Sequence, residues 1–289
     1  MPLVSVGMPL YNSAPWIESA VRSILAQTLT DLELILCDNA SEDASREICE
    51  RLAAEDARIR YRRHDRNIGA NRNYRSTLEY ATGKYFKWMS SSDLYGPTFL
   101  ADCVAELESK PDVVLAIGNT VLFADVAEDG KIYDGDFALP SADAKERFAK
   151  LLTSLQLNNV FNGVMRTSVI RSIGPLGTFG MADVVLMAEL ALRGKFLLLD
   201  KPHFYRRMTP DTATKLKSAQ EIQQHLEPKV AQPLLWQAWI FYSALLGAAL
   251  RSTRFGAERL RVLSYVLRQM IWDRRKLLGD VAQALGRVV

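Results

Sequence analysis

The chain opens with the apolar run Leu3-Val4-Ser5-Val6-Gly7-Met8, which is followed by Pro9-Leu10-Tyr11-Asn12. A second apolar run, Leu32-Glu33-Leu34-Ile35-Leu36-Cys37, ends at Asp38, and residues 14–27 between the two runs have helical spacing. This pattern predicts a strand–helix–strand unit whose parallel strands end at the same edge of a sheet. Ligands of open α/β sheets bind at that edge. We therefore expect a small-molecule site where the Pro9–Asn12 loop lies beside Asp38.

The alternation of apolar runs and helical stretches continues along the chain. It predicts an α/β fold with a doubly wound, mostly parallel sheet flanked by helices. The further strands are expected at 59–61, 85–89, 113–117, 160–165, 196–199 and 203–207, and the further helices at 41–52, 70–80 and 181–192, with another that begins at Pro97.

The composition is that of an ordinary globular protein of 289 residues, with 48% hydrophobic and 24% charged residues. Its three cysteines, Cys37, Cys49 and Cys103, have no metal-ligand spacing, so free thiols in a reducing compartment are expected. The first strand begins at once, which leaves no room for a signal peptide and predicts a cytoplasmic location. No nucleic-acid partner is expected.

The C-terminal part has a different pattern. The chain is predicted to be wholly helical from about Thr214, which gives a domain at 1–213 and a helical extension at 214–289. The stretch Leu234–Leu250 is marginal for crossing a membrane, so a buried or interfacial helix is favoured. An amphipathic basic helix follows, and residues 251–289 hold nine Arg and Lys against three Asp and Glu. A solvated helix face, a peripheral membrane contact, a homodimer contact and a cover over one side of the predicted site all remain open.

Three stretches together resemble the family 2 inverting glycosyltransferases, which have the GT-A fold. They are VSVGMPLYNSAPWIESAVRSILAQTLTDLELILCDNASED, NIGANRNYRSTLEYATGKYFKWMSSSDLYGPTFL and GTFGMADVVLMAELALRGKFLLLDKPHFYRR, in order over roughly residues 1–210. The resemblance implies a Rossmann-like domain that moves a sugar from a nucleotide-diphosphate donor to an acceptor hydroxyl. A UDP-sugar is the favoured donor, and a cell-surface glycan or a lipid-linked precursor is the expected acceptor.

The resemblance implies roles for residues at two strand ends. The loop with Pro9, Tyr11 and Asn12 is expected to line the nucleoside, and Asp38 to bond the base or a ribose hydroxyl. The alternative for Asp38 is a turn residue before the next helix. In the same way Asn67 and Gly69 either approach the donor closely or form a plain turn.

The resemblance also implies a catalytic base, which must take the acceptor proton as the oxygen attacks. The family places this acid after a Gly-rich loop at the start of a helix, which is Asp183 in this sequence. Ala182 stands where the family has Glu, and Asp183 could instead only cap the helix. Glu189 lies two turns further on and is expected to face away from the site.

At the diphosphate end the sequence departs from the family pattern. Ser90 and Ser92 replace both acids of the Asp-x-Asp motif that holds Mg²⁺ or Mn²⁺, and Thr209 stands where many relatives have His. Asp93 remains, as the expected metal ligand, with Ser92 beside it.

Three routes stay open for the charge of the diphosphate. Asp93 could hold the metal with donor phosphates and water, or Arg206 or Arg207 could neutralise the diphosphate. The third route is a site that binds without catalysing, which corresponds to a catalytically weakened protein that binds sugar nucleotides or glycans. A nucleotidyltransferase is disfavoured, because Pro9–Asn12 occupies the place of its Gly-rich phosphate loop.

Overall fold

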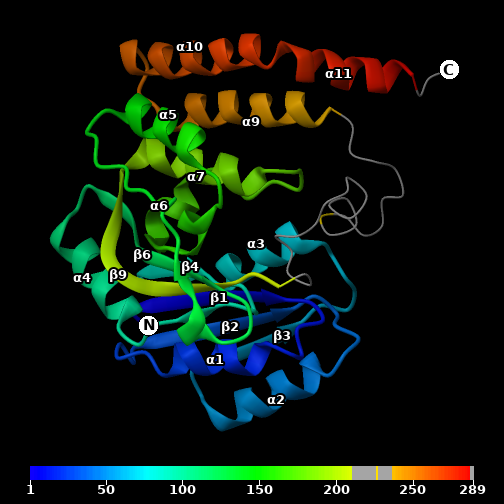
Figure 1. The fold of residues 1–289 in the computed structure, drawn as a ribbon, viewed down its shortest axis with the longest axis vertical. Helices are drawn as coiled ribbons and strands as arrows, with labels where there is room; N and C mark the ends of the chain where they lie inside the picture. Colours follow the sequence, from blue (N-terminus) through cyan, green and yellow to red (C-terminus); the bar gives the residue numbers. More distant parts are fainter. Residues whose placement is uncertain (210–225, 227–235, 287–289) are drawn as a thin grey trace.

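The computed structural model describes residues 1–209, 226 and 236–286. The expected boundary between residues 213 and 214 lies outside the described residues. Figure 1 shows one sheet with helices on both faces and a separate layer of helices at the C-terminal end. The α/β architecture with a mostly parallel sheet and C-terminal helices is therefore confirmed.

The N-terminal half contains the parallel part of the sheet. Strand β1 (Val4–Leu10) pairs with β2 (Leu32–Asp38) from Val4 opposite Leu32 to Leu10 opposite Asp38. All residues of both strands are buried, because helices cover both faces of this sheet. The remaining elements of this half are α1 (Ile17–Leu25), α2 (Ser45–Glu55), β3 (Ile59–Arg63), α3 (Ala70–Tyr80) and β4 (Tyr85–Trp88).

The strand β1 extends two residues further than the sequence suggests, since Pro9 and Leu10 belong to the strand and not to the loop. The pairing of β1 with β4 ends at Gly7, whereas its pairing with β2 continues to Leu10. Pro9 therefore lies where β1 has one neighbour only, which is a position that tolerates the missing N–H.

The second half of the sheet is mixed. The order along the main path is β3-β2-β1-β4-β8-β6-β9-β5, with β7 paired to β6. Strand β8 (Val164–Arg166) runs antiparallel to both β4 and β6, whereas β6 (Val113–Phe123) and β9 (Lys195–Arg207) run parallel to each other. The short strands are β5 (Leu94–Tyr95) and β7 (Lys131–Ile132), and α4 (Phe99–Ser109) precedes β6.

Two expected strands differ in the structure. The stretch predicted as a strand at 160–165 contains most of a 3-10 turn, η2 (Asn159–Asn162), and only its end enters β8. The runs at 196–199 and 203–207 form one continuous strand, β9. A register shift at Asn119, which pairs with Pro202, lets β9 continue past the proline.

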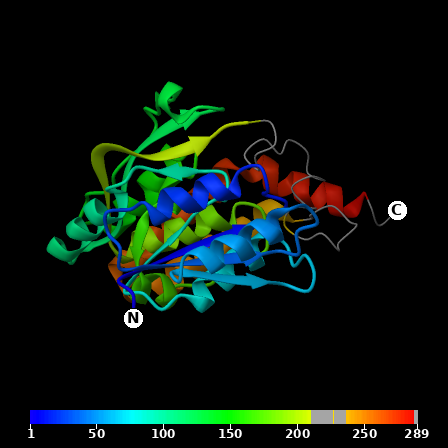
Figure 2. The same cartoon turned by 90° about the horizontal axis from the view of Figure 1, so that it is seen from below.

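The C-terminal helices stack on the helical face of the first domain. Helix α9 (Gln237–Ser252) packs on α7 (Ala182–Arg193), and α10 (Ala257–Trp272) packs on α9 and on α5 (Ala144–Ser154). Helix α11 (Arg274–Leu285) also contacts α9. Figures 1 and 2 place α1 and α2 on one side of the sheet and these helices beyond the opposite side. The remaining short elements are η1 (Ala127–Asp129) and α6 (Thr167–Ser172).

An ion pair links α7 to α9. Glu189 is 1% exposed, and its two carboxylate oxygens accept hydrogen bonds from Arg251 Nη2 at 2.7 Å and Nε at 3.1 Å. The Ser252 hydroxyl donates a third bond at 2.9 Å. Glu189 therefore faces the C-terminal helices and holds them to the first domain, a contact that the sequence did not predict.

No helix in the described ranges is long and apolar enough to span a bilayer. The three cysteines are buried free thiols.

Candidate active site

The loops that follow β1 and β2 are joined by side-chain hydrogen bonds. Ser41 Oγ accepts the Asn12 N–H at 3.0 Å, and Asn12 Oδ1 accepts the Glu42 N–H at 2.9 Å. Ser45 Oγ accepts the Ser13 N–H at 2.7 Å. Asn12 has φ 48, a left-handed conformation that Asn tolerates better than most residues. The expected juxtaposition of these two loops is confirmed.

Tyr11 projects from this region with 43% of its surface exposed, whereas Pro9 is buried. Tyr11 is therefore accessible to a ligand at the carboxyl edge, whereas Pro9 belongs to the buried strand β1.

Asp38 lies at this edge but is fully buried. Its Oδ1 accepts the Ser41 N–H at 2.8 Å, and its Oδ2 accepts the Tyr61 hydroxyl at 2.8 Å. Arg63 Nε lies 3.3 Å from the same Oδ2. In this structure the carboxylate closes the turn after β2 and ties it to β3.

Asn67 and Gly69 form the adjoining turn. Asn67 Oδ1 accepts hydrogen bonds from Asn39 Nδ2 at 2.8 Å and from the Gly69 N–H at 2.9 Å. Gly69 has φ 86 and immediately precedes α3, so a side chain would be strained there. Ile68 in turn donates its N–H to Asn39 Oδ1 at 2.8 Å. Asn39, which the sequence did not single out, thus connects the β2 end to this turn.

The Ser90–Asp93 segment follows β4. Ser90 Oγ and Ser92 Oγ lie 3.0 Å apart and hydrogen-bond to each other. Asp93 is 4% exposed, and its Oδ1 accepts the Arg207 N–H at 3.0 Å. Burial raises the pKa of Asp93 to about 6, although Arg206, Lys87 and Arg207 act in the opposite direction.

The guanidinium of Arg207 is bound by backbone carbonyls. Its Nε donates to the Ser92 carbonyl at 3.1 Å, and its Nη1 donates to the Ala124 carbonyl at 2.6 Å. The guanidinium lies 4.3 Å from the ring centroid of Trp16 and 4.5 Å from that of Phe123. Arg207 therefore fixes the Ser92–Asp93 backbone, and of the two arginines considered for the diphosphate only Arg206 has a half-exposed side chain.

Asp183 and Arg206 are held by two adjacent residues. Asn158 Nδ2 donates to Asp183 Oδ2 at 2.8 Å, and Arg206 Nη1 donates to Asn159 Oδ1 at 2.6 Å. Asn159 Nδ2 in turn donates to Asp136 Oδ1 at 2.8 Å. Asp183 lies in the first turn of α7, whose start has no side-chain capping bond, so its carboxylate bonds Asn158 instead of capping the helix.

Tyr74 of α3 interacts electrostatically with charged residues of the site. Burial raises the pKa of Tyr74, Asp93 and Asp183 raise it further, and Arg206 lowers it. The Tyr74 ring packs edge-on against Phe161 at 5.5 Å. Neither Tyr74 nor the Asn158–Asn159 pair was predicted from the sequence.

The described side chains do not by themselves make a metal site, and Asp93 is the one carboxylate of the Ser90–Asp93 segment. Within the described ranges, no group of three or more His, Cys, Asp or Glu side chains could hold a metal ion. Asp93 is a single buried carboxylate whose charged neighbours are cations, and Lys87 Nζ beneath it is buried 3.4 Å from the Tyr95 ring centroid. Mg²⁺ and Mn²⁺ prefer several hard oxygen ligands, so a cation at Asp93 would need further oxygen ligands from donor phosphates and water.

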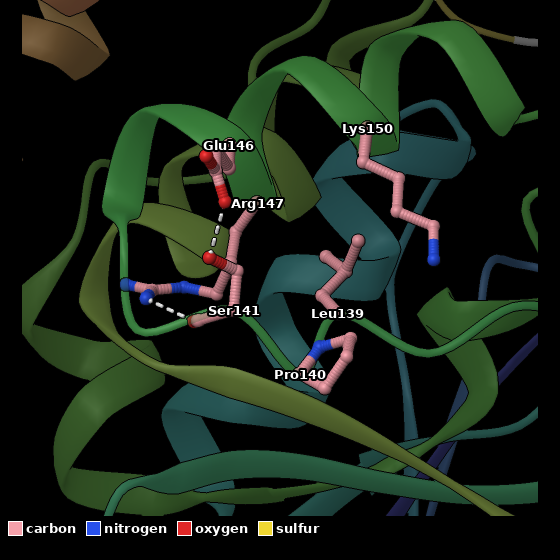
Figure 3. A pocket seen from close by; sticks show the side chains of 6 residues that line it. All are labelled: Leu139, Pro140, Ser141, Glu146, Arg147 and Lys150. Atoms are coloured by element: carbon pink, nitrogen blue, oxygen red, sulfur yellow. Dashed lines mark hydrogen bonds between the residues drawn. The ribbon is translucent and has the colours of Figure 1, made fainter.

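A separate pocket of about 370 Å³ lies beside the first half of α5 (Figure 3). Its polar groups bond one another, since Ser141 Oγ donates to Glu146 Oε2 at 2.7 Å and Arg147 Nη1 donates to the Ser141 carbonyl at 2.9 Å. The pocket contains none of the predicted site residues, and we assign it no function.

The chain is similar in sequence to known glycosyltransferases. The chain is 34% identical over 118 residues to the uncharacterized glycosyltransferase EpsJ of Bacillus subtilis, covering 41% of this chain and 34% of that protein. It is 30% identical over 131 residues to the glycosyltransferase GlyG of Streptococcus pneumoniae, covering 45% and 42% respectively. The chain thus spans less than half the length of these curated relatives.

Solved structures share the fold. S. aureus TarS 1–349 in complex with UDP-GlcNAc has a TM-score of 0.64 at 15% identity, covering 92% of this chain and 72% of that one. The mannosyltransferase PcManGT from Pyrobaculum calidifontis, in complex with GDP-Man and Mn²⁺, has a TM-score of 0.55 at 16% identity, covering 97% and 84%.

The sequence profile described as Glycosyl transferase family 2 matches residues 5–172, which is more than half of the chain. Together with the GT-A-type sheet and the glycosyltransferase relatives, this match shows that the chain belongs to glycosyltransferase family 2.

Proposed function

We propose that the protein is an inverting glycosyltransferase that moves a sugar from a nucleotide diphosphate, with a UDP-sugar as the favoured donor, to an acceptor hydroxyl. The observation that carries the proposal is the Asn158–Asn159 pair, which holds Asp183 on one side and Arg206 on the other. Two adjacent residues thereby hold a carboxylate at the start of α7 and a guanidinium at the end of β9.

The proposed reaction uses both groups. Asp183 accepts the proton of the acceptor hydroxyl while the acceptor oxygen bonds the anomeric carbon from one face. The bond between that carbon and the diphosphate oxygen breaks on the opposite face, which inverts the configuration. Arg206 meets the negative charge of the leaving diphosphate, because a guanidinium pairs well with phosphate oxygens. Asn158 orients the carboxylate of Asp183, the general base.

The nucleoside half of the donor is assigned to the joined loops. Tyr11 and Asn12 lie on one side, and Asn67 and Gly69 lie on the other. Asp38 remains our candidate for the base contact, and this contact requires the Tyr61 and Arg63 side chains to move aside, because both now bond its Oδ2. The UDP-GlcNAc that TarS binds supports a uridine nucleotide as donor.

Donor turnover with a panel of UDP-, GDP- and dTDP-sugars tests the role of Asp183 as the catalytic base. Asp183→Asn should reduce turnover by about 100-fold or more, in line with the loss of a general base. Asn158→Ala, which removes the donor to Asp183, should reduce turnover and leave UDP affinity unchanged. Asp200→Asn is the matched control, since Asp200 is an exposed carboxylate on β9 bonded only to Asn119 among the described contacts. An Asp183→Asn enzyme with wild-type turnover would contradict the assignment.

The same assay separates the routes for the diphosphate charge. If Arg206 neutralises it, turnover persists in EDTA and falls in Arg206→Gln. If Asp93 instead holds Mg²⁺ or Mn²⁺ together with donor phosphates and water, EDTA abolishes turnover and Mn²⁺ restores it.

The second candidate is a catalytically weakened protein that binds sugar nucleotides or glycans. The observation that favours it is the loss of the usual acids at Ser90 and Ser92, with Thr209 where many relatives have His. Calorimetry with UDP, with and without Mn²⁺, distinguishes the two: binding without turnover of any donor supports this candidate.

For the acceptor we propose a cell-surface glycan or a lipid-linked precursor, reached from the cytoplasmic face of a membrane. The C-terminal helices are the proposed means of contact, either with that membrane or with a second copy of the chain.

A further inference from the structure

The outer side of the C-terminal helices exposes large apolar side chains. Their surfaces are 51–68% exposed, although helices of a globular domain normally turn such residues inward. We call this surface the C-terminal face; it consists of Leu260, Leu267, Ile271, Trp272, Leu278 and Leu285.

On α10, three of the exposed residues form a stripe distinct from the core-facing side of that helix. Leu260, Leu267 and Ile271 recur at spacings of seven and four, which places them on one side of α10. Val262 and Val266 lie on the other side of α10 and are fully buried against the protein. The helix thus has two apolar sides, and only one is needed for folding.

Basic side chains accompany the stripe. Arg261 pairs with Asp143 at 2.6 Å, and Lys276 pairs with Asp273 at 3.0 Å. Within residues 1–209 and 236–286, no carboxylate forms an ion pair with Arg268, Arg274 or Arg275. These three charges therefore lie next to exposed apolar groups without a counter-charge from the described protein.

Trp272 is both an exposed apolar side chain and a neighbour of one of these arginines. Its ring is 63% exposed, and the Arg268 guanidinium lies 5.5 Å from the ring centroid. An exposed Trp beside Arg is typical of the headgroup level of a bilayer, where the ring lies at the boundary of headgroups and acyl chains and the cation meets phosphate.

We propose that the C-terminal face docks in plane on an anionic phospholipid membrane. The apolar stripe would enter the boundary of headgroups and acyl chains, and Arg268, Arg274 and Arg275 would meet lipid phosphates. A second copy fits less well, because a two-fold contact would bring the same unpaired arginines of both copies together.

The position of the face agrees with this role. Figures 1 and 2 show that β1 runs away from the N-terminus toward the side on which α11 ends, so the carboxyl edge of the sheet and α11 lie on the same side of the molecule. Docking of the outer side of the C-terminal helices would leave α9 and α7 between the membrane and the sheet, with the carboxyl edge open toward the side on which α11 ends. The docking proposal itself does not rest on the transfer reaction, since vesicle binding is measured without a donor.

Co-sedimentation of the whole chain with lipid vesicles tests the proposal. Vesicles of phosphatidylcholine alone are compared with vesicles that contain about one third phosphatidylserine. We expect binding to the anionic vesicles only, weakened by salt. Ile271→Glu should lower the partition coefficient about tenfold, because it places a charge in the inserted stripe. Ile132→Glu is the matched control: Ile132 is 65% exposed on β7 and should bind as the wild type does.

A second set of variants tests whether vesicle binding requires the positive charges of the C-terminal face. Arg268→Gln combined with Arg275→Gln should weaken binding to anionic vesicles, and the corresponding Lys substitutions should retain it. Far-UV circular dichroism confirms folding, and calorimetry with UDP shows that the nucleotide site is unchanged. Absent binding to anionic vesicles overturns the proposal, as does equal binding by wild type and Ile271→Glu. A stable dimer that Ile271→Glu dissociates, without vesicle binding, would assign the face to a second copy.

Discussion

Asp93 is the residue whose surroundings most directly predict a pH effect. Its pKa rises from 3.8 to about 6 because burial disfavours the carboxylate, so the folded state holds this proton more tightly than the unfolded state. The resulting stabilisation is fully present below pH 3.8 and is lost as the pH rises through 6.

Asp93→Asn removes this titration, and an amide oxygen can still accept the Arg207 N–H. Relative to Asp93→Asn, the wild type should therefore lose about 3 kcal/mol of unfolding free energy between acidic and neutral pH, at ~1.4 kcal/mol per pKa unit. Urea unfolding at both pH values measures the difference. Asp200→Asn should follow the wild type, and parallel profiles for wild type and Asp93→Asn would show that Asp93 titrates normally.

At this scale the sequence predicted the positions that follow directly from strand order. Tyr11, Asn12 and Asp38 lie together because β1 and β2 are parallel and end in register. The sequence could not reveal Asn158 and Asn159, because their partners Asp183 and Arg206 lie far along the chain. It also could not show that Arg207 is occupied by backbone carbonyls, since those contacts depend on the path of β6 and β9.

At the scale of elements, the helices and parallel strands of the first half were predicted well, because each has a clear period and clear ends. Helix α3 spans Ala70–Tyr80, as expected. Errors occur where tertiary pairing overrides a local signal. Pro202 suggests a break in the sequence, but the register shift opposite it keeps β9 continuous.

We expect the Glu189–Arg251 pair, which joins α7 to α9, to contribute measurably to the free energy of unfolding. Arg251→Ala leaves the Glu189 carboxylate buried with Ser252 as its remaining side-chain donor. We expect a loss of about 2 kcal/mol in unfolding free energy, below the value for a fully buried pair because the Arg251 side chain is half exposed.

Denaturant unfolding of three variants checks this contribution. Glu189→Gln combined with Arg251→Gln should lose less than Arg251→Ala, because no buried charge remains. Arg46→Ala removes an exposed i,i+4 pair with Glu50 and should change stability by less than about 0.5 kcal/mol. If Arg251→Ala lowers the unfolding free energy no more than Arg46→Ala does, the Glu189–Arg251 pair does not stabilise the contact between α7 and α9.

At the scale of the whole molecule, the sequence established an α/β domain followed by helices but not how the two parts meet. Amphipathic spacing shows that a helix has an apolar side without showing what covers it. Of the expected apolar stripe on α10, Leu263 and Met270 pack against the core, whereas Leu260, Leu267 and Ile271 face outward. This division depends on the packing of α10 against α5 and α9, which periodicity does not encode.

Truncation tests whether the C-terminal helices are part of the folded core. A chain that ends at Thr209 would lose the side of α9 that buries Tyr242, Leu245, Ala248 and Ala249, and would uncover α7. Burial of each large apolar side chain is worth about 1.5–3 kcal/mol, so the loss would be roughly 5 kcal/mol. Small domains have only about 5–15 kcal/mol in total, so this chain should be marginally stable and bind an apolar dye.

A chain that ends at Ser252 is the informative comparison, because it retains α9 and the Glu189–Arg251 pair while it lacks α10 and α11. We expect it to unfold cooperatively and to bind UDP, but to lose vesicle binding together with the C-terminal face. Thermal unfolding followed by circular dichroism, with calorimetry for UDP, measures both properties. If the chain that ends at Thr209 is as stable as the full chain, then α9 is an attachment and not part of the core. If the chain that ends at Ser252 still binds anionic vesicles, the membrane contact lies elsewhere in the protein.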